Sequence, residues 1–259
     1  MLELKNITFN VDDDGQDKEI VRNVSLKIPD KRLIVVTGPN GGGKSTLARL
    51  IAGIEKPSEG RILMDGEDIT DLSVTDRAKK GISFAFQQPV RFKGIQVFDL
   101  IKLARGKNIS MADACDYLSA VGLCARDYID REVNSSLSGG ELKRIEIATV
   151  LARDSKLAVF DEPEAGIDLW SFANLIEVFE KMRGRSIMII SHQERILNIA
   201  DDIVVLKNGQ IAENGPREEI LPGLMGTASA VPECKRAGAG VEKTENDGKE
   251  DSACDDTGE

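Results

Sequence analysis

The chain has 259 residues, about 1.7 times the usual 150 residues per domain, so one large domain or a core with a subdomain is expected. Lys and Arg number 34 against 44 Asp and Glu, and this net charge of −10 argues against a broad nucleic-acid interface. The longest apolar runs fall short of the ~20 residues that cross a bilayer, and the start lacks a secretion signal. We therefore expect a cytoplasmic chain with no nucleic-acid partner and no direct membrane insertion.

The predicted elements begin with an antiparallel hairpin, because residues 2–11 and 20–28 are strand-like and flank a polar stretch. Short apolar runs then alternate with stretches of helical period, which is typical of parallel strands covered by helices. The predicted strands are residues 33–37, 82–86, 157–160, 187–190 and 203–206. A tight turn is predicted at residues 207–210.

Helical spacing dominates between Gln96 and Ala152, where no strand is predicted. The predicted helices there are residues 97–104, 111–121 and 139–152. The expected fold class is therefore α/β, with an N-terminal antiparallel β subdomain and a helical insertion subdomain at about residues 90–152.

The last 33 residues, 227–259, hold nine acidic and four basic residues and no aromatic residue. Such a composition buries too little apolar surface to offset its ordering entropy, so a disordered acidic tail is predicted after a folded unit at residues 1–226. The tail carries Cys234 and Cys254, whose spacing does not suggest metal ligands.

A glycine-rich segment follows the predicted strand at residues 33–37 and runs into a helix-like stretch, matching the pattern G-x-x-x-x-G-K-[ST]. Its glycines let backbone N–H groups approach phosphates, Lys44 supplies charge between the β- and γ-phosphates, and Ser45 can ligate Mg²⁺. The sequence therefore predicts a nucleoside triphosphate site. Its predicted binding residues are Gly38, Asn40, Gly41, Gly42, Gly43, Lys44, Ser45 and Thr46.

Two carboxylates, Asp161 and Glu162, end the strand predicted at residues 157–160, at the sheet edge that should face the phosphates. Asp161 is predicted to hold Mg²⁺ through water. Glu162 is predicted to accept a proton from the attacking water, or to orient it.

Further motifs follow in a characteristic order: Gln87 after one strand, Leu137-Ser138-Gly139-Gly140-Glu141 at a helix start, and His192 after another strand. With them the chain resembles ATP-binding cassette (ABC) ATPases, a P-loop family, over about residues 1–215. The resemblance implies an ATP- and Mg²⁺-dependent ATP hydrolase that sandwiches two ATP molecules in a homodimer.

The resemblance also implies roles for single residues. Gln87 would sense the γ-phosphate and Mg²⁺, and His192 would contact the γ-phosphate. Ser138 and Gly140 would present a helix N-terminus to the triphosphate of the other protomer, while Asp168 would communicate across the dimer. The chain departs from the usual pattern at Glu141, where Gln is common. It also lacks the aromatic residue that commonly stacks on adenine; Val11 and Phe9 are the candidates in its place.

Residues 81–90, the pairs Gly140-Glu141 and Lys143-Arg144, and residues 191–197 look like the SufC-type ATPase of the SUF iron–sulfur cluster assembly machinery. That resemblance implies a SufB-like scaffold partner, with two ATPase and two scaffold chains in one complex. Pro163-Glu164-Ala165 and the acidic tail depart from better-known members, which suggests a divergent, minimal form.

The alternative is the nucleotide-binding subunit of a membrane ABC transporter; a non-transport mechanical ATPase and an inactive binding module are further alternatives. In either main interpretation, Phe92, Lys93, Ile95 and Phe98 are the predicted partner patch, unless they form the core of the helical insertion.

Overall fold

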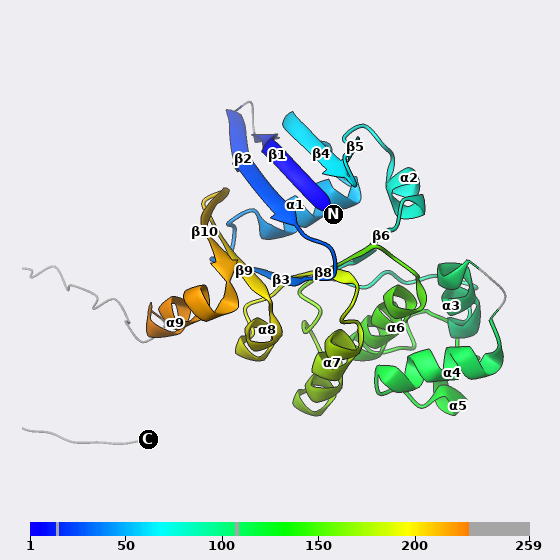
Figure 1. Ribbon diagram of the computed structural model, residues 1–259. Coiled ribbons are helices and arrows are strands. Elements are labelled where there is room, and N and C mark those ends of the chain that lie inside the picture. The colour runs from blue at the N-terminus through cyan, green and yellow to red at the C-terminus, as the bar shows by residue number, and fades with distance from the viewer. Residues whose placement is uncertain (14–15, 107–108, 228–259) are drawn as a thin grey trace, which may run out of the picture.

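The computed structural model describes residues 1–13, 16–106 and 109–227, and two β-sheets stand one above the other in it (Figure 1). The strands of the larger sheet are β3 (Leu33–Thr37), β6 (Ile82–Ala85), β7 (Leu157–Asp161), β8 (Ser186–Ile190), β9 (Asp202–Lys207) and β10 (Gln210–Pro216). Their order is β10-β9-β3-β8-β7-β6. All neighbours are parallel except β10, which pairs antiparallel with β9.

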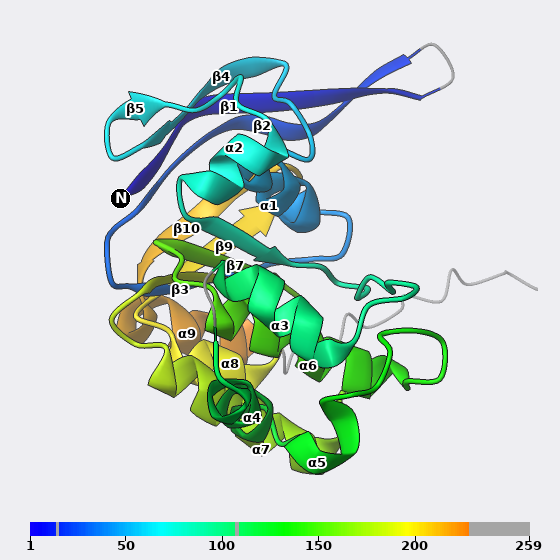
Figure 2. The ribbon, with the colours of Figure 1, turned by 90° about the vertical axis from the view of Figure 1, so that its right-hand side faces the viewer.

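The smaller sheet is antiparallel, with the order β2-β1-β4-β5. Its strands are β1 (Leu2–Asp13), β2 (Gln16–Ile28), β4 (Glu59–Met64) and β5 (Glu67–Asp68). Helix α1 (Lys44–Ala52) lies between the two sheets, and α2 (Val74–Lys79) lies beside it (Figures 1 and 2).

The remaining helices lie on the opposite side of the larger sheet. They are α3 (Val97–Arg105), α4 (Met111–Ala120), α5 (Ala125–Tyr128), α6 (Gly139–Ala152), α7 (Leu169–Lys181), α8 (Glu194–Ile199) and α9 (Arg217–Thr227). Helices α3 to α6 gather at one end of the molecule, and α6 continues from this group to the sheet (Figure 2). No helix of the described residues is long and apolar enough to cross a membrane.

The core has two layers because the central strands are buried on both faces. Along β3, Ile34 and Val36 pack into the layer shared with α1 and the antiparallel sheet. Leu33 and Val35 pack into the other layer, with α6 and α7. Because these strands are packed on both faces, the sheet edge that carries the phosphate loop, Asp161 and Glu162 is held in place from two sides.

The predicted fold class is confirmed: the chain is α/β, with an antiparallel β subdomain and helical parts. The five strands predicted for the sheet are present, although β6 ends at Ala85 and β7 extends through Asp161. The hairpin strands reach Asp13 and Gln16, further than predicted. Residues 228–259 of the predicted tail lie outside the described part of the chain, and Thr227 ends α9.

Candidate active site

The phosphate loop joins β3 to α1 and is held by backbone contacts that only glycine permits. Gly38 has a φ of 132°, and a Cβ there would lie 2.0 Å from the carbonyl oxygen of Leu206. Gly43, the N-cap of α1, has a φ of 93°, and a Cβ would lie 2.7 Å from the oxygen of Ile20. The loop is therefore fitted against β9 and β2, with the N-terminus of α1 free of side-chain caps. This arrangement fits a triphosphate.

Lys44 opens α1 and is 5% exposed. Its Nζ donates to the carbonyl oxygens of Gly38, at 2.8 Å, and Pro39, at 2.9 Å, so the ammonium lies within the loop. Burial lowers the pKa of Lys44, while the carboxylates of Glu162 and Asp161 raise it. A cation is thus held where phosphate charge would be bound.

Ser45 and Asp161 bring two oxygen ligands together, since Ser45 Oγ donates to Asp161 Oδ1 at 2.9 Å. Asp161 is 2% exposed, and burial raises its pKa, whereas the Ser45 hydrogen bond lowers it. Hydroxyl and carboxylate oxygens suit Mg²⁺, so these residues fit the ion; together with Gln87 they would hold it. When bound, Mg²⁺ neutralises charge on the phosphates.

Glu162 follows β7 with a φ of 45°, a left-handed conformation that is unusual for a residue other than glycine. Its N–H donates to Ile190 O at 3.0 Å, which anchors it to the end of β8. Its Oε2 accepts a hydrogen bond from Gln87 Nε2 at 2.6 Å. Strained backbone of this kind often occurs at functional sites, and the contact with Gln87 brings together two residues predicted for the site.

His192 follows β8, beside the same edge of the sheet. Burial and the charge of Lys44 lower its pKa, and Glu162 raises it. At neutral pH the imidazole is therefore uncharged, able to donate from one nitrogen and accept at the other. The charges of Lys44 and Glu162 therefore both act on the His192 imidazole.

The signature segment starts α6 with a capping box. Ser138 Oγ accepts from Glu141 N–H at 3.2 Å, and Glu141 Oε2 accepts from Ser138 N–H at 2.7 Å. The hydroxyl of Tyr128 also donates to Glu141, and this bond is the main cause that lowers the pKa of the Glu141 carboxyl. Glu141 therefore places a carboxylate at the helix N-terminus.

Gly140 lies close to the segment that carries Asp168: a Cβ at Gly140 would be 2.9 Å from Gly166 O. Asp168 accepts from Ser171 N–H at 3.0 Å and from Ser171 Oγ–H at 2.7 Å. Among the described residues, no hydrogen bond joins Ser138 or Gly140 to the phosphate loop.

Of the adenine candidates, Phe9 is half-buried and packs against the core, whereas Val11 is 41% exposed.

Two further site features were not predicted from the sequence. Glu164 Oε1 accepts from the hydroxyl of Ser191, next to His192, and a buried Lys143 underlies the segment carrying Gln87. Charged residues in a helix-like stretch gave no signal that one of them is buried.

This fold and site define a P-loop nucleoside triphosphatase. A family model described as ABC transporter matches residues 21–165. An uncharacterized ABC transporter ATP-binding protein of Methanocaldococcus jannaschii is 38% identical over 214 residues, covering 79% of this chain and 86% of the relative. The probable ATP-dependent transporter ycf16 of Cyanidium caldarium is 30% identical over 214 residues, covering 76% and 84%.

Among solved structures, the dimeric ATP-binding cassette MJ0796 in a post-hydrolysis state with ADP and Pi matches with a TM-score of 0.75. It is 25% identical, and the match covers 84% of this chain and 99% of that one. The chain belongs to the ABC transporter ATPase family. It binds ATP with Mg²⁺ and hydrolyses ATP.

Proposed function

We propose that this ATPase is the SufC-type motor of iron–sulfur cluster assembly, and that its ATP-driven dimerisation changes the conformation of a SufB-like scaffold. The proposal is supported by the resemblance of residues 81–90, 140–144 and 191–197 to that branch. This resemblance is the observation that carries the proposal, and an apolar pocket beside Gln87 adds a docking site for a protein partner next to the nucleotide. The working unit is residues 1–226, with its helical subdomain at about 90–152, and it acts in the cytoplasm.

The hydrolytic roles proposed for this site follow from its geometry. Glu162 accepts a proton from the attacking water, and Gln87, 2.6 Å from its carboxylate, reports on the phosphate end of ATP. Lys44 stabilises the phosphate charge, and the neutral His192 forms a hydrogen bond to the γ-phosphate. The start of α6, with Ser138 as its N-cap, completes the site of the partner protomer, a role that the resemblance to ABC ATPases supports.

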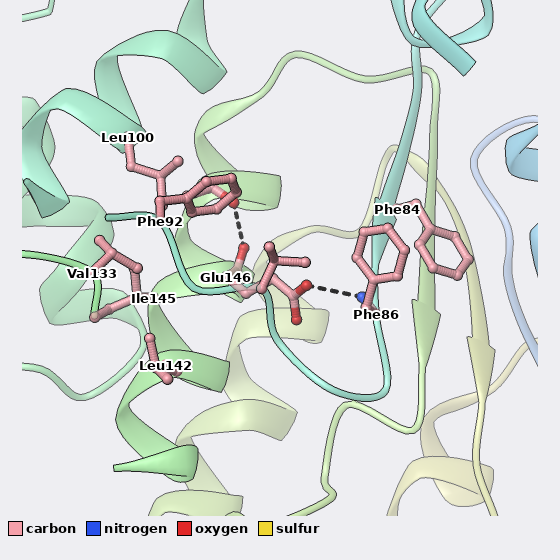
Figure 3. Close-up of a pocket in the computed structure, with 10 residues that line it drawn as sticks. Phe84, Phe86, Phe92, Leu100, Val133, Leu142, Ile145 and Glu146 are labelled. Carbon is pink, nitrogen blue, oxygen red and sulfur yellow. Dashed lines mark hydrogen bonds between the residues drawn. The ribbon is translucent and has the colours of Figure 1, made fainter. Parts of the chain in front are cut away.

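The pocket has a cavity volume of about 150 Å³ and opens between the end of β6 and helices α3 and α6 (Figure 3). Its lining is Phe84, Phe86, Val90, Phe92, Leu100, Val133, Leu142, Ile145, Glu146 and Thr149. Phe86, Val90 and Phe92 are 37%, 45% and 37% exposed, so large apolar side chains face solvent beside Gln87. Exposed apolar clusters of this kind mark interaction sites.

The predicted partner patch overlaps this pocket at Phe92 alone. Lys93 is exposed, but Ile95 and Phe98 are half-buried, and Phe98 packs against the core of the helical subdomain. The docking site is therefore centred on Phe86 and Phe92.

A second candidate function is favoured by the names of the relatives. Both curated relatives described above are named as transporter proteins, and a membrane subunit could use the same pocket. In that case the chain is the ATP-binding subunit of a membrane transporter with the same hydrolytic mechanism.

Affinity purification of the tagged chain from its native cell, under anaerobic conditions, distinguishes the scaffold motor from the transporter subunit. We expect a stoichiometric SufB-like protein in the soluble fraction. A multi-span membrane protein recovered from detergent extracts in its place would refute the scaffold proposal.

Matched variants test the docking site in the same experiment. Phe92→Ser should lose the partner, because it removes an apolar anchor from the pocket. Leu103→Ser is the control, since Leu103 is 68% exposed on α3 and does not line the pocket; it should retain the partner. Equal recovery with both variants would show that the partner binds elsewhere.

A further inference from the structure

A lysine is completely buried behind the nucleotide site. Lys143, on α6, has a side-chain exposure of 0%. Its Nζ donates to the main-chain oxygen of Phe86, and lies 3.3 Å from that of Gln87 and 3.5 Å from that of Asp161. One ammonium therefore bridges α6 and the ends of β6 and β7, at the two points where Gln87 and Asp161 leave the sheet.

Glu146, one turn further along α6, binds the main chain of the same residue, Phe86, through its N–H. Its Oε1 accepts from Phe86 N–H at 2.9 Å, and its Oε2 lies 3.5 Å from Lys143 Nζ. The carboxylate points from α6 toward the main-chain nitrogen of Phe86, which lines the apolar pocket (Figure 3). Lys143 thus donates a hydrogen bond to the C=O of Phe86, and Glu146 accepts one from its N–H, one residue before Gln87.

Stability alone does not account for this pair. Burial lowers the pKa of Lys143 and raises that of Glu146, so both pay a desolvation cost that their mutual attraction offsets only in part. Buried ion pairs can often be replaced by apolar residues of similar volume without loss of stability. The neighbours Leu142 and Ile145 show that this part of α6 accommodates apolar side chains. What apolar residues could not supply is directional hydrogen bonding to the Gln87 segment.

We propose that Lys143 and Glu146 are positioning residues for ATP hydrolysis. They fix the Gln87 segment and the end of β7, and thereby set Gln87 and Asp161 relative to the phosphate loop. Neither side chain touches the phosphate loop; they act through the main chain of residues 86, 87 and 161. Because Glu146 also lines the pocket, the pair connects the pocket to the nucleotide site.

The inference rests on the ATPase activity and does not depend on the identity of the partner. The test uses Lys143→Met and the double variant Lys143→Met/Glu146→Leu, in the full chain without a partner. Lys181→Met is the matched control, because Lys181 is a helical lysine paired with Glu177 at 3.8 Å but is 61% exposed.

For Lys143→Met we expect kcat to fall about tenfold or more, because small displacements of catalytic groups are costly. KM for ATP should stay within about threefold, since Lys44 and the loop are intact. The Mg²⁺ concentration that half-maximally strengthens binding of a fluorescent ATP analogue should rise about tenfold, as is typical when supporting groups around a metal are lost.

The double variant separates positioning from folding. It removes both buried charges, so its urea unfolding midpoint should equal or exceed that of Lys143→Met, while kcat and the Mg²⁺ requirement stay impaired. Lys181→Met should match the wild type in every measurement. A double variant that folds and shows the wild-type kcat and Mg²⁺ requirement would overturn the proposal.

Discussion

Glu141→Gln replaces the signature carboxylate with the amide that is usual in ABC ATPases, and its effects on stability and on dimerisation should have opposite signs. In the wild type, the carboxylate accepts from Ser138 N–H at 2.7 Å and from the hydroxyl of Tyr128. It also lies in the first turn of α6, where negative charge interacts favourably with the helix dipole.

The stability loss follows from these contacts. Hydrogen bonds to an ionised acceptor are roughly twice as strong as neutral ones, so weakening two of them at this half-buried site should cost about 1 kcal/mol. For a chain of this length, that corresponds to about 2–4 °C in the unfolding temperature. The pKa of Glu141 is below its usual value of 4.5, so its carboxylate stabilises the fold above that pH. The difference from the glutamine variant should shrink as pH falls below about 4.5.

The effect on the dimer comes from charge. At a separation of one Debye length, about 8 Å at physiological ionic strength, a carboxylate repels a phosphate by about 0.5 kcal/mol per unit charge in water, and salt reduces this by about half or more. With two phosphate charges at each of two symmetric sites, the screened repulsion sums to about 1 kcal/mol. Its removal in the variant should make ATP-dependent dimerisation roughly fivefold tighter.

Thermal unfolding of the single variant, and sedimentation with ATP in a Glu162→Gln background, measure the two effects. Glu177→Gln is the control, because Glu177 is 67% exposed on α7, and it should change neither quantity. Unchanged stability together with a weaker dimer in Glu141→Gln would refute the reasoning.

Four further outcomes are expected. Lys44→Ala should weaken ATP binding about tenfold or more in calorimetric titration, because a charged donor to the phosphates is lost; unchanged affinity would contradict its role. Glu162→Gln should bind ATP, abolish turnover and trap a dimer visible by light scattering, whereas wild-type turnover would refute its role as the base. Ser138→Arg should prevent the ATP-dependent dimer but leave binding of ATP to one protomer measurable; an unchanged dimer would exclude the cross-protomer role. Because burial raises the pKa of Glu164, Glu164→Gln should gain stability relative to the wild type as pH rises above about 4.5, and urea midpoints that shift in parallel with pH would contradict this.

Much of the larger sheet could be predicted because its strands are buried on both faces and are therefore continuous apolar runs. Strands β3, β7 and β8 are buried at every position, and all three were predicted within one residue. Strand β4 was missed, because only Ile62 and Met64 of its residues are fully buried and its pairing with β1 is long-range.

The site residues could be predicted from motifs, but the contacts between them could not. The Gln87–Glu162 hydrogen bond depends on β6 and β7 being neighbours, a pairing that lies 75 residues apart in the chain. The buried Lys143–Glu146 pair has an i,i+3 spacing, which is also typical of a solvated helix face. Only the placement of α6 against the sheet shows that this face is turned inward.

We propose that two copies of this ATPase drive a SufB-like scaffold and not a membrane transporter. The most direct test is native mass spectrometry of the complex purified anaerobically without detergent. We predict a mass equal to two copies of this chain and two copies of a SufB-like chain. A complex that survives only in detergent and contains a membrane-spanning chain would contradict the claim.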